Sequence, residues 1–293
     1  MFQTVLAHLI GTNSDESVLA LGLHLANAQA GHIECLRVTP DLDSVATQID
    51  QLGMAGWITL SDRLAQLKRE TGERTKSAKA NFESFRRDAK LDISSEPHSS
   101  RSLSTNYRED TGEEVDRILW LSRYYDAVVL AGGFNATEAL SGAALGTIIM
   151  GSGRPVLLAP NARTARPFDT IAIAWKDTAE AARSLTAAMP LLEQAKQIEL
   201  ICAEEGEAKR HERVASYENI LRYLRWHGFN AKGHFVTVGA GTAAEAVLDR
   251  AQNTGADLLV TGAYGHSRQR EYIFGGFTEH LLKGAGLPVM LFH

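Results

Sequence analysis

The residues best suited to chemistry form a glycine-rich stretch near the end of the chain. Gly262 is followed after two residues by Gly265, and nine residues separate Gly265 from the pair Gly275 and Gly276. Because glycine has no side chain, a loop bounded by glycines lets backbone amides approach an anion closely. A helix that begins after such a loop adds unpaired N–H groups and the positive end of its dipole. The pattern therefore predicts a phosphate-binding loop.

Polar residues within and after this loop offer further contacts. His266, Ser267 and Arg268 lie inside it, where each can donate a hydrogen bond to a phosphate oxygen or simply be solvated. Thr278 follows two positions after Gly276, and its hydroxyl either reaches the ligand or packs and caps the helix. Catalysis by His266 is not expected, because local spacing pairs it with no carboxylate or nucleophile.

Other catalytic signatures are absent from the sequence. It contains no Gly-x4-Gly-Lys-Ser/Thr, Gly-x-Gly-x-x-Gly, His-Glu-x-x-His or Gly-x-Ser-x-Gly pattern, so ordinary kinase, dehydrogenase and hydrolase functions lose support. The ten histidines are scattered without metal-ligand spacing. Cys35 and Cys202 lie in apolar, strand-like runs, so we expect them to be buried, with a redox pair or a catalytic thiol as the alternative.

Composition and charge narrow the class of protein. The chain has 293 residues, 44% of them hydrophobic and 22% charged, which suits two globular domains of about 150 residues each. Its formal net charge of -5 supplies no basic surface for nucleic acid. No stretch approaches the roughly 18 apolar residues of a membrane span, and the start lacks the basic region of a signal peptide. We therefore expect a cytoplasmic protein that binds neither nucleic acid nor membrane.

Self-similarity divides the chain into two copies of one unit. The segments YDAVVLAGG (125–133) and GRPVLLAP (153–160) recur as GADLLVTGA (255–263) and GLPVMLFH (286–293). Upstream, FQTVLAHLIG and HIECLRV in the first copy correspond to FDTIAIAW and QIELICA in the second. Because both order and spacing are kept, the sequence indicates a tandem repeat.

Each repeat alternates short Val/Ile/Leu runs with amphipathic stretches, the pattern of parallel strands covered by helices on both faces. The predicted fold class is α/β, with two tandem doubly wound domains, each a five-stranded parallel sheet. The expected strands of the first repeat are 3–10, 32–38, 91–95, 126–131 and 155–159. Those of the second are 169–175, 196–203, 232–238, 256–262 and 288–292, with helices at 178–194, 209–227, 242–253 and 276–284.

Three further segments each carry an expectation. Residues 161–167 are polar and end in proline, so they are predicted to link domain 1 (1–160) to domain 2 (168–293). The charge-rich segment 61–90 is predicted to be one long helix. Residues 94–111 have almost no apolar periodicity and are predicted to form a mobile loop.

Two capping signals recur at equivalent places in the repeats. Thr111-Gly-Glu-Glu114 and Thr242-Ala-Ala-Glu245 both have the spacing of a capping box, in which the threonine and glutamate side chains satisfy backbone N–H groups at a helix start. Each signal predicts a helix that begins directly after its threonine.

The Gly-x2-Gly-x9-Gly spacing that starts at Gly262, after a predicted strand and before a predicted helix, resembles the nucleotide-binding signature of the universal stress protein family. The repeat order resembles its tandem members, and 261–282 is the most specific part. The resemblance implies an adenine nucleotide α-hydrolase-like fold, a role in the stress response and domain pairing through the last strand. It also implies ATP or another adenine nucleotide as ligand, with or without Mg²⁺, and no metal-ligand cluster of the protein's own.

Two positions depart from the family pattern. The usual Ser or Thr after the last loop glycine is Gly276 here, and the acidic residue expected after the first strand is replaced by Lys176, with Asp177 one place later. Asp177 either contacts the ribose or, with Glu180, caps the following helix. The candidate nucleotide-binding residues are therefore Gly262, Gly265, His266, Ser267, Arg268, Gly275, Gly276, Thr278 and Asp177.

The first repeat lacks this loop pattern, because aligning its strands with those of the second leaves the loop after LAGG about three residues short. Domain 1 is therefore expected to be a degenerate partner of domain 2. The preferred hypothesis is a nucleotide-responsive module that recruits an unknown protein partner and hydrolyses ATP slowly at most. The rivals are an interaction protein that has lost its ligand and an enzyme of the wider fold group. The repeats are expected to pair within one chain, and whether two chains form a homodimer is left open.

Overall fold

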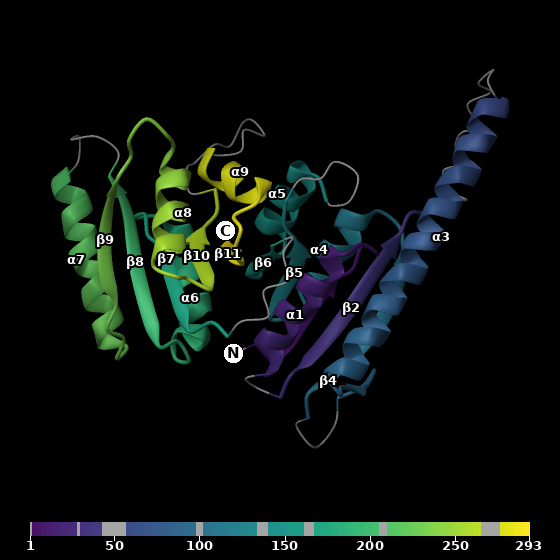
Figure 1. Ribbon diagram of the computed structural model, residues 1–293, viewed down its shortest axis with the longest axis horizontal. Coiled ribbons are helices and arrows are strands. Elements are labelled where there is room, and N and C mark those ends of the chain that lie inside the picture. The colour runs from purple at the N-terminus through teal and green to yellow at the C-terminus, as the bar shows by residue number, and fades with distance from the viewer. Residues whose placement is uncertain are drawn as a thin grey trace.

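In a computed structural model, the described residues form one continuous sheet of 11 strands to which both parts of the chain contribute (Figure 1). The structure describes residues 2–27, 30–42, 57–97, 102–133, 140–160, 167–204, 210–264 and 276–293. We call residues 2–160 the first half and residues 167–293 the second half. Of the predicted link (161–167), residues 161–166 lie outside the described residues, so the domain boundary stays a prediction.

Both halves alternate strands with helices. The first half contains strands β1 (Thr4–His8), β2 (His32–Thr39), β3 (Asp92–Ile93), β4 (Ser104–Thr111), β5 (Ala127–Ala131) and β6 (Val156–Ala159), and helices α1 (Ser14–Asn27), α3 (Trp57–Asp88), α4 (Glu114–Ser122) and α5 (Gly142–Gly151). The second half contains strands β7 (Thr170–Ala174), β8 (Gln197–Glu204), β9 (Lys232–Thr237), β10 (Leu258–Gly262) and β11 (Val289–Phe292), and helices α6 (Ala179–Leu192), α7 (Arg210–Trp226), α8 (Ala243–Asn253) and α9 (Gly276–Lys283).

The sheet is parallel within each half. Its strand order is β3-β4-β2-β1-β5-β6-β11-β10-β7-β8-β9, and each neighbouring pair except β6–β11 is parallel. Helices α1, α3, α6 and α7 pack on one face and α4, α5, α8 and α9 on the other. Successive strand residues such as Val5 and Leu6 serve opposite cores. The predicted α/β class is confirmed.

A pair of aspartates marks the repeat in the structure. The Asp126 carboxylate, just before β5, accepts hydrogen bonds from the backbone N–H groups of Gln3 and Thr4 at 2.8 and 2.9 Å. The Asp257 carboxylate, just before β10, accepts one from the N–H of Thr170 at 3.0 Å. Each aspartate thus ties the start of a central strand to its neighbour, and Asp126 and Asp257 occupy equivalent places in the two halves.

Residues 104–111 form strand β4, so the predicted loop at 94–111 is wrong for this part. The strand lies between β2 and the short β3. Ser104 and Thr105 are buried, and the Thr105 hydroxyl donates to the carbonyl of Ile33 at 2.8 Å. Tyr107 packs on Phe82 of α3, with 5.3 Å between ring centroids. The buried positions of this strand carry hydroxyl groups that bond to β2 instead of apolar side chains, so the sequence shows no apolar periodicity here.

The two capping signals have different outcomes. The Thr242 box is confirmed, because its hydroxyl accepts from the Glu245 N–H at 3.2 Å and the Glu245 carboxylate accepts from the Thr242 N–H at 2.7 Å. The Thr111 box is wrong. Thr111 is the last residue of β4, and α4 starts after Glu113, whose side chain makes no capping hydrogen bond.

Helix α3 confirms the predicted long helix and extends it toward the amino terminus. It runs for 32 residues, which corresponds to about 48 Å. Its carboxyl-terminal part packs on the sheet through Ala78 and Phe82, whereas its amino-terminal part projects beyond the sheet at the right of Figure 1.

The two halves meet through their last strands, as expected. Strands β6 and β11 pair antiparallel, and the facing residues are Val156 and Leu291, Leu157 and Met290, and Leu158 and Val289. On one side of this strand pair, the backbone N–H of Phe168 donates to His24 Nε2 at 3.3 Å and the two rings stack edge to face at 4.2 Å. Near the carboxyl end of β5, the Gly133 N–H donates to the Leu282 carbonyl at 3.2 Å.

Candidate functional site

In the second half, the carboxyl end of β10 packs directly on the start of α6. A side chain at Gly262 would place its Cβ 2.5 Å from the amide nitrogen of Ala181 and 2.7 Å from the carbonyl carbon of Glu180. Both neighbours are backbone atoms, which cannot swing aside, so only glycine fits. Gly262 therefore has a packing reason of its own, and it brings the amino end of α6 beside the residues that lead into the predicted loop.

The segments that flank the predicted loop are held together. The backbone N–H of Tyr264 points to the hydroxyl of Thr278 at 3.5 Å, and Thr278 is buried. Tyr264 has a φ of 60°, in the left-handed region that non-glycine residues rarely adopt. This contact fixes the start of the loop against the first turn of α9.

Helix α9 begins at Gly276, which is exposed. Among the described residues outside its own helix turn, no atom lies within 4 Å of the position that a side chain at Gly276 would take. The serine or threonine of the family pattern would therefore fit here without displacing a neighbour.

The residues after β7 are exposed at the same end of the parallel strands. Thr178, and not Asp177, caps α6, because the Thr178 hydroxyl accepts from the Ala181 N–H at 3.3 Å. The capping alternative for Asp177 is therefore wrong. Asp177 lies one residue before the cap with its side chain exposed, next to the helix turn on which Gly262 packs.

The predicted contacts are only partly within the described residues. Strand β10 ends with Gly262, and α9 begins with the turn that contains Gly276 and Thr278. Asp177 lies just before the amino end of α6. The remaining predicted contacts lie outside the described residues: Gly265, His266, Ser267, Arg268 and Gly275.

A cavity of about 330 Å³ lies at the carboxyl ends of β1 and β2 in the first half. Helix α3 and the start of α4 form its sides. Its lining combines an apolar group, Ile10, Val38, Pro40, Leu67 and Leu140, with a charged group, Arg37, Arg74, Glu70, Glu113 and Glu114.

Arg37 is the most buried charged residue of this lining, with 5% of its surface exposed. Its Nη1 donates to the Leu9 carbonyl at 3.4 Å and its Nε to the Thr75 hydroxyl at 3.5 Å. Burial lowers the pKa of the Arg37 guanidinium from its ordinary value. Both hydrogen bonds are at the long limit of the normal range.

The Glu114 carboxylate at the start of α4 lies against the buried His8, with 3.1 Å between Glu114 Oε1 and His8 Nε2. Burial by itself raises the pKa of the Glu114 carboxyl, but the His8 hydrogen bond and the charges of Arg37 and Arg74 outweigh it. The pKa therefore lies below its ordinary value, and the carboxylate is ionised at neutral pH.

Sequence reasoning singled out neither Arg37 nor Arg74, and it singled out Glu114 only as a capping residue. A signal for Arg37 was present in the repeat itself. The registers pair Thr4 with His32 and Thr170 with Gln197, and this makes Arg37 of β2 equivalent to Cys202 of β8. An arginine in one copy of a buried strand, at the place of a small apolar residue in the other, points to a local function.

Both cysteines are buried, as expected. Burial raises the pKa of the Cys35 thiol to about 12 and that of the Cys202 thiol to about 12. At neutral pH both thiols are therefore protonated and unreactive.

Among the described residues, no cluster of three His, Cys, Asp or Glu side chains could hold a metal ion. None of the helices there is both long and apolar enough to cross a membrane.

Comparison with known proteins places the second half in a family. Residues 174–293 match the universal stress protein family. A universal stress protein of Synechocystis sp. is 32% identical over 79 residues, which is 27% of this chain and 26% of that protein. Another, from Methanocaldococcus jannaschii, is 30% identical over 74 residues, which is 25% of this chain and 44% of that protein. The matches thus span less than half of either relative.

Solved structures extend the likeness to the whole chain. The crystal structure of a universal stress protein from Archaeoglobus fulgidus aligns with 100% of this chain and 98% of its own, with a TM-score of 0.63 and 16% identity. A universal stress protein solved in complex with cAMP aligns with 44% of this chain and 99% of its own, with a TM-score of 0.34 and 17% identity. Residues 174–293 are therefore a universal stress protein domain, and the chain as a whole has the α/β fold of that family.

Proposed function

We propose that this chain is a nucleotide-responsive module whose second half binds ATP or a related adenine nucleotide at the carboxyl ends of β7 and β10. The observation that carries the proposal is the junction at which Gly262 packs on α6 while Tyr264 contacts Thr278 of α9. This junction holds the amino ends of two helices at the two ends of a glycine-rich segment. Helix amino ends and glycine-rich backbone favour phosphate groups.

The nucleotide acts by changing a surface that a protein partner recognises. Mg²⁺ accompanies ATP through the phosphate oxygens, since the described residues offer no metal cluster of their own. Hydrolysis is slow at most, because the sequence pairs no nucleophile or base at this edge. A cytoplasmic location and a homodimer belong to the same proposal.

A ligand-free interaction protein is the rival function. Gly276 and Lys176 favour it, because they remove the hydroxyl and the acidic group that the family pattern supplies. The open space at Gly276 makes the two functions separable by experiment, since side chains can be added there without disturbing the fold.

The test uses three variants at that position. Gly276→Asp places a carboxylate at the first residue of α9. The helix dipole stabilises a negative charge there, but the carboxylate repels a phosphate group. Gly276→Asn has nearly the same shape without the charge, and Gly276→Ser restores the family hydroxyl. We expect millimolar Mg-ATP to raise the Tm of the parent, Asn and Ser proteins by a few degrees and that of the Asp variant much less. Isothermal calorimetry should show the same order, with cAMP as a second probe.

The other results decide against the proposal. An equal Tm shift in the Asp and Asn variants would place the nucleotide away from α9. No shift in any of the four proteins, together with silent calorimetry, leaves the ligand-free interaction protein.

A further inference from the structure

The cavity of the first half is large enough for a ligand, although the sequence predicted a degenerate site there. Its volume of about 330 Å³ lies at the lower end of the range for small-molecule pockets. It opens where β2 ends, between α3 and the start of α4, and no residue of the proposed nucleotide site lines it. The cavity is therefore a separate candidate.

The guanidinium of Arg37 has hydrogen-bonding capacity left for a ligand. Arginine carries five N–H donors, and among the described residues Arg37 uses two of them, in long bonds to Leu9 and Thr75. A charged side chain that is 95% buried is rare unless it is paired. The remaining donors belong to a residue that lines the cavity.

The charges around the cavity favour an anion in its inner part. The Glu114 carboxylate lies 3.1 Å from His8 Nε2, and the charges of Arg37 and Arg74 also lower the pKa of this carboxyl. Glu70 and Glu113 are exposed, at the outer side of the lining. The lining thus combines the buried Arg37 guanidinium with the Glu114 carboxylate, which also lies against His8.

Two further features suit an anion with an apolar body. Helix α4 starts without a side-chain cap, so its first N–H groups contribute a positive end to the cavity wall. The apolar wall formed by Ile10, Val38, Leu67 and Leu140 offers contacts to a ring or a short hydrocarbon chain but no partner for a second charge.

The second half shows that the fold does not require this arginine. Cys202 stands at the equivalent place of β8 and is buried like Arg37. A buried arginine costs more to desolvate than a cysteine, and its two long hydrogen bonds offset little of that cost. A ligand anion would add a hydrogen-bonding partner to the charge of Glu114, which already acts on Arg37.

We propose that the first half binds a small organic anion, a carboxylate or phosphate ester with an apolar body, and that Arg37 holds the anionic group. Benzoate and phenyl phosphate serve as probes, because they share the ring and differ in the anion. Inorganic phosphate is the third probe and lacks the apolar body.

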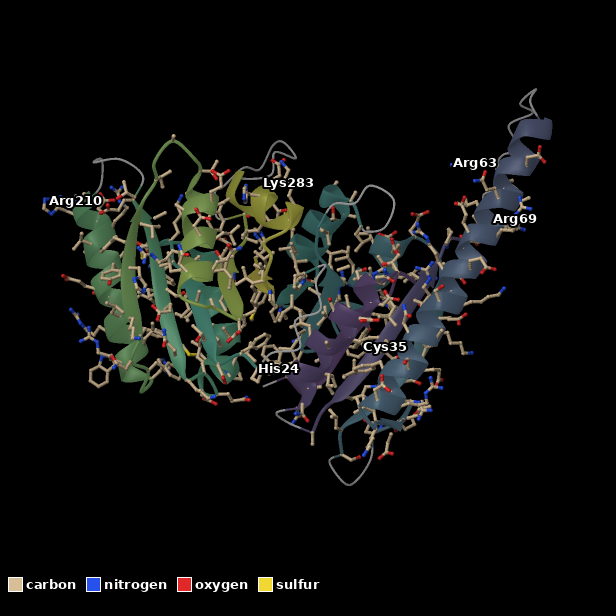
Figure 2. The ribbon with its side chains drawn as sticks, in the orientation of Figure 1. His24, Cys35, Arg63, Arg69, Arg210 and Lys283 are labelled. Atoms are coloured by element: carbon tan, nitrogen blue, oxygen red, sulfur yellow. The ribbon has the colours of Figure 1, made fainter. Side chains whose placement is uncertain are left out.

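The test compares two arginine variants of the full chain. Arg37→Met removes the buried guanidinium. Arg63→Met makes the same change of net charge on the projecting part of α3, far from the sheet (Figure 2), where Arg63 bonds to the exposed Gln66. We expect benzoate or phenyl phosphate to bind the parent and Arg63→Met proteins within about twofold of each other. Arg37→Met should bind about tenfold more weakly or not at all, as loss of a charge-assisted hydrogen bond predicts.

A second measurement keeps the proposal testable if Arg37→Met fails to fold. In the parent protein, the arginine Nε–H resonances are followed by NMR during titration, with Arg37 assigned from selective labelling. A saturable shift of the Arg37 resonance supports the proposal, and the stronger of the two aromatic probes identifies the anion class. No shift with any probe, equal weakening in both variants, or binding of inorganic phosphate as tight as that of phenyl phosphate would overturn it. Gly276→Asp should leave anion binding at Arg37 unchanged. A failure of the anion proposal can therefore be told apart from a failure of the nucleotide proposal.

Discussion

At the level of single residues, the glycines at the two ends of the predicted loop have different surroundings. Gly262 touches the backbone of α6, whereas the side-chain position at Gly276 is open. A glycine motif read from sequence alone assigns both to the ligand. The packing shows that the first has a structural role, whatever it contributes to binding.

This difference makes a prediction about stability. Gly262→Ala should lower the free energy of unfolding by about 1–3 kcal/mol or more, because its Cβ would overlap backbone atoms that cannot move away. Gly276→Ala should change it by less than about 1 kcal/mol, since the site is open. Urea unfolding measures both values. Equal destabilisation by the two substitutions would show that the contact between β10 and α6 is not tight.

At the level of elements, apolar periodicity predicted most of the fold, because the central strands and the inner helix faces meet mainly apolar neighbours. It failed at β4, where Ser104 and Thr105 are buried through hydrogen bonds and not through apolar contact. The two candidate sites also differ in how far the sequence revealed them. Glycine spacing predicted a binding loop after β10, whereas Arg37 stayed hidden because one charged residue in a strand is usually taken as exposed.

The two capping signals test how far a local motif depends on its surroundings. Thr242→Ala should cost about 1 kcal/mol of stability, since it removes the hydroxyl that accepts from the N–H of Glu245. Thr111→Ala should cost less than about 0.5 kcal/mol, because Thr111 is exposed at the end of β4 and caps no helix. The comparison requires only chemical denaturation of both variants. A larger loss for Thr111→Ala would contradict the assignment of α4.

At the level of the whole molecule, the β6–β11 pair holds the halves in one sheet. Residues 1–160 and 167–293, produced as separate chains, should bind each other, because each alone would expose an apolar strand edge. Light scattering after size-exclusion chromatography should show a one-to-one complex on mixing, and Met290→Glu in the second fragment should abolish it, since Met290 is fully buried opposite Leu157. Monomeric fragments that ignore each other would show that the strand pair contributes little to association.

The same strand pair has a consequence for how this molecule can change over evolution. In a symmetric homodimer every substitution appears twice, so a residue on the twofold axis must tolerate its own copy. Here Leu157 faces Met290 and Val156 faces Leu291, so each position can vary alone. Joining two copies in one chain thereby allows them to diverge. The equivalent positions Arg37 and Cys202 show such a divergence. One gene can in this way carry two different binding specificities on a single sheet.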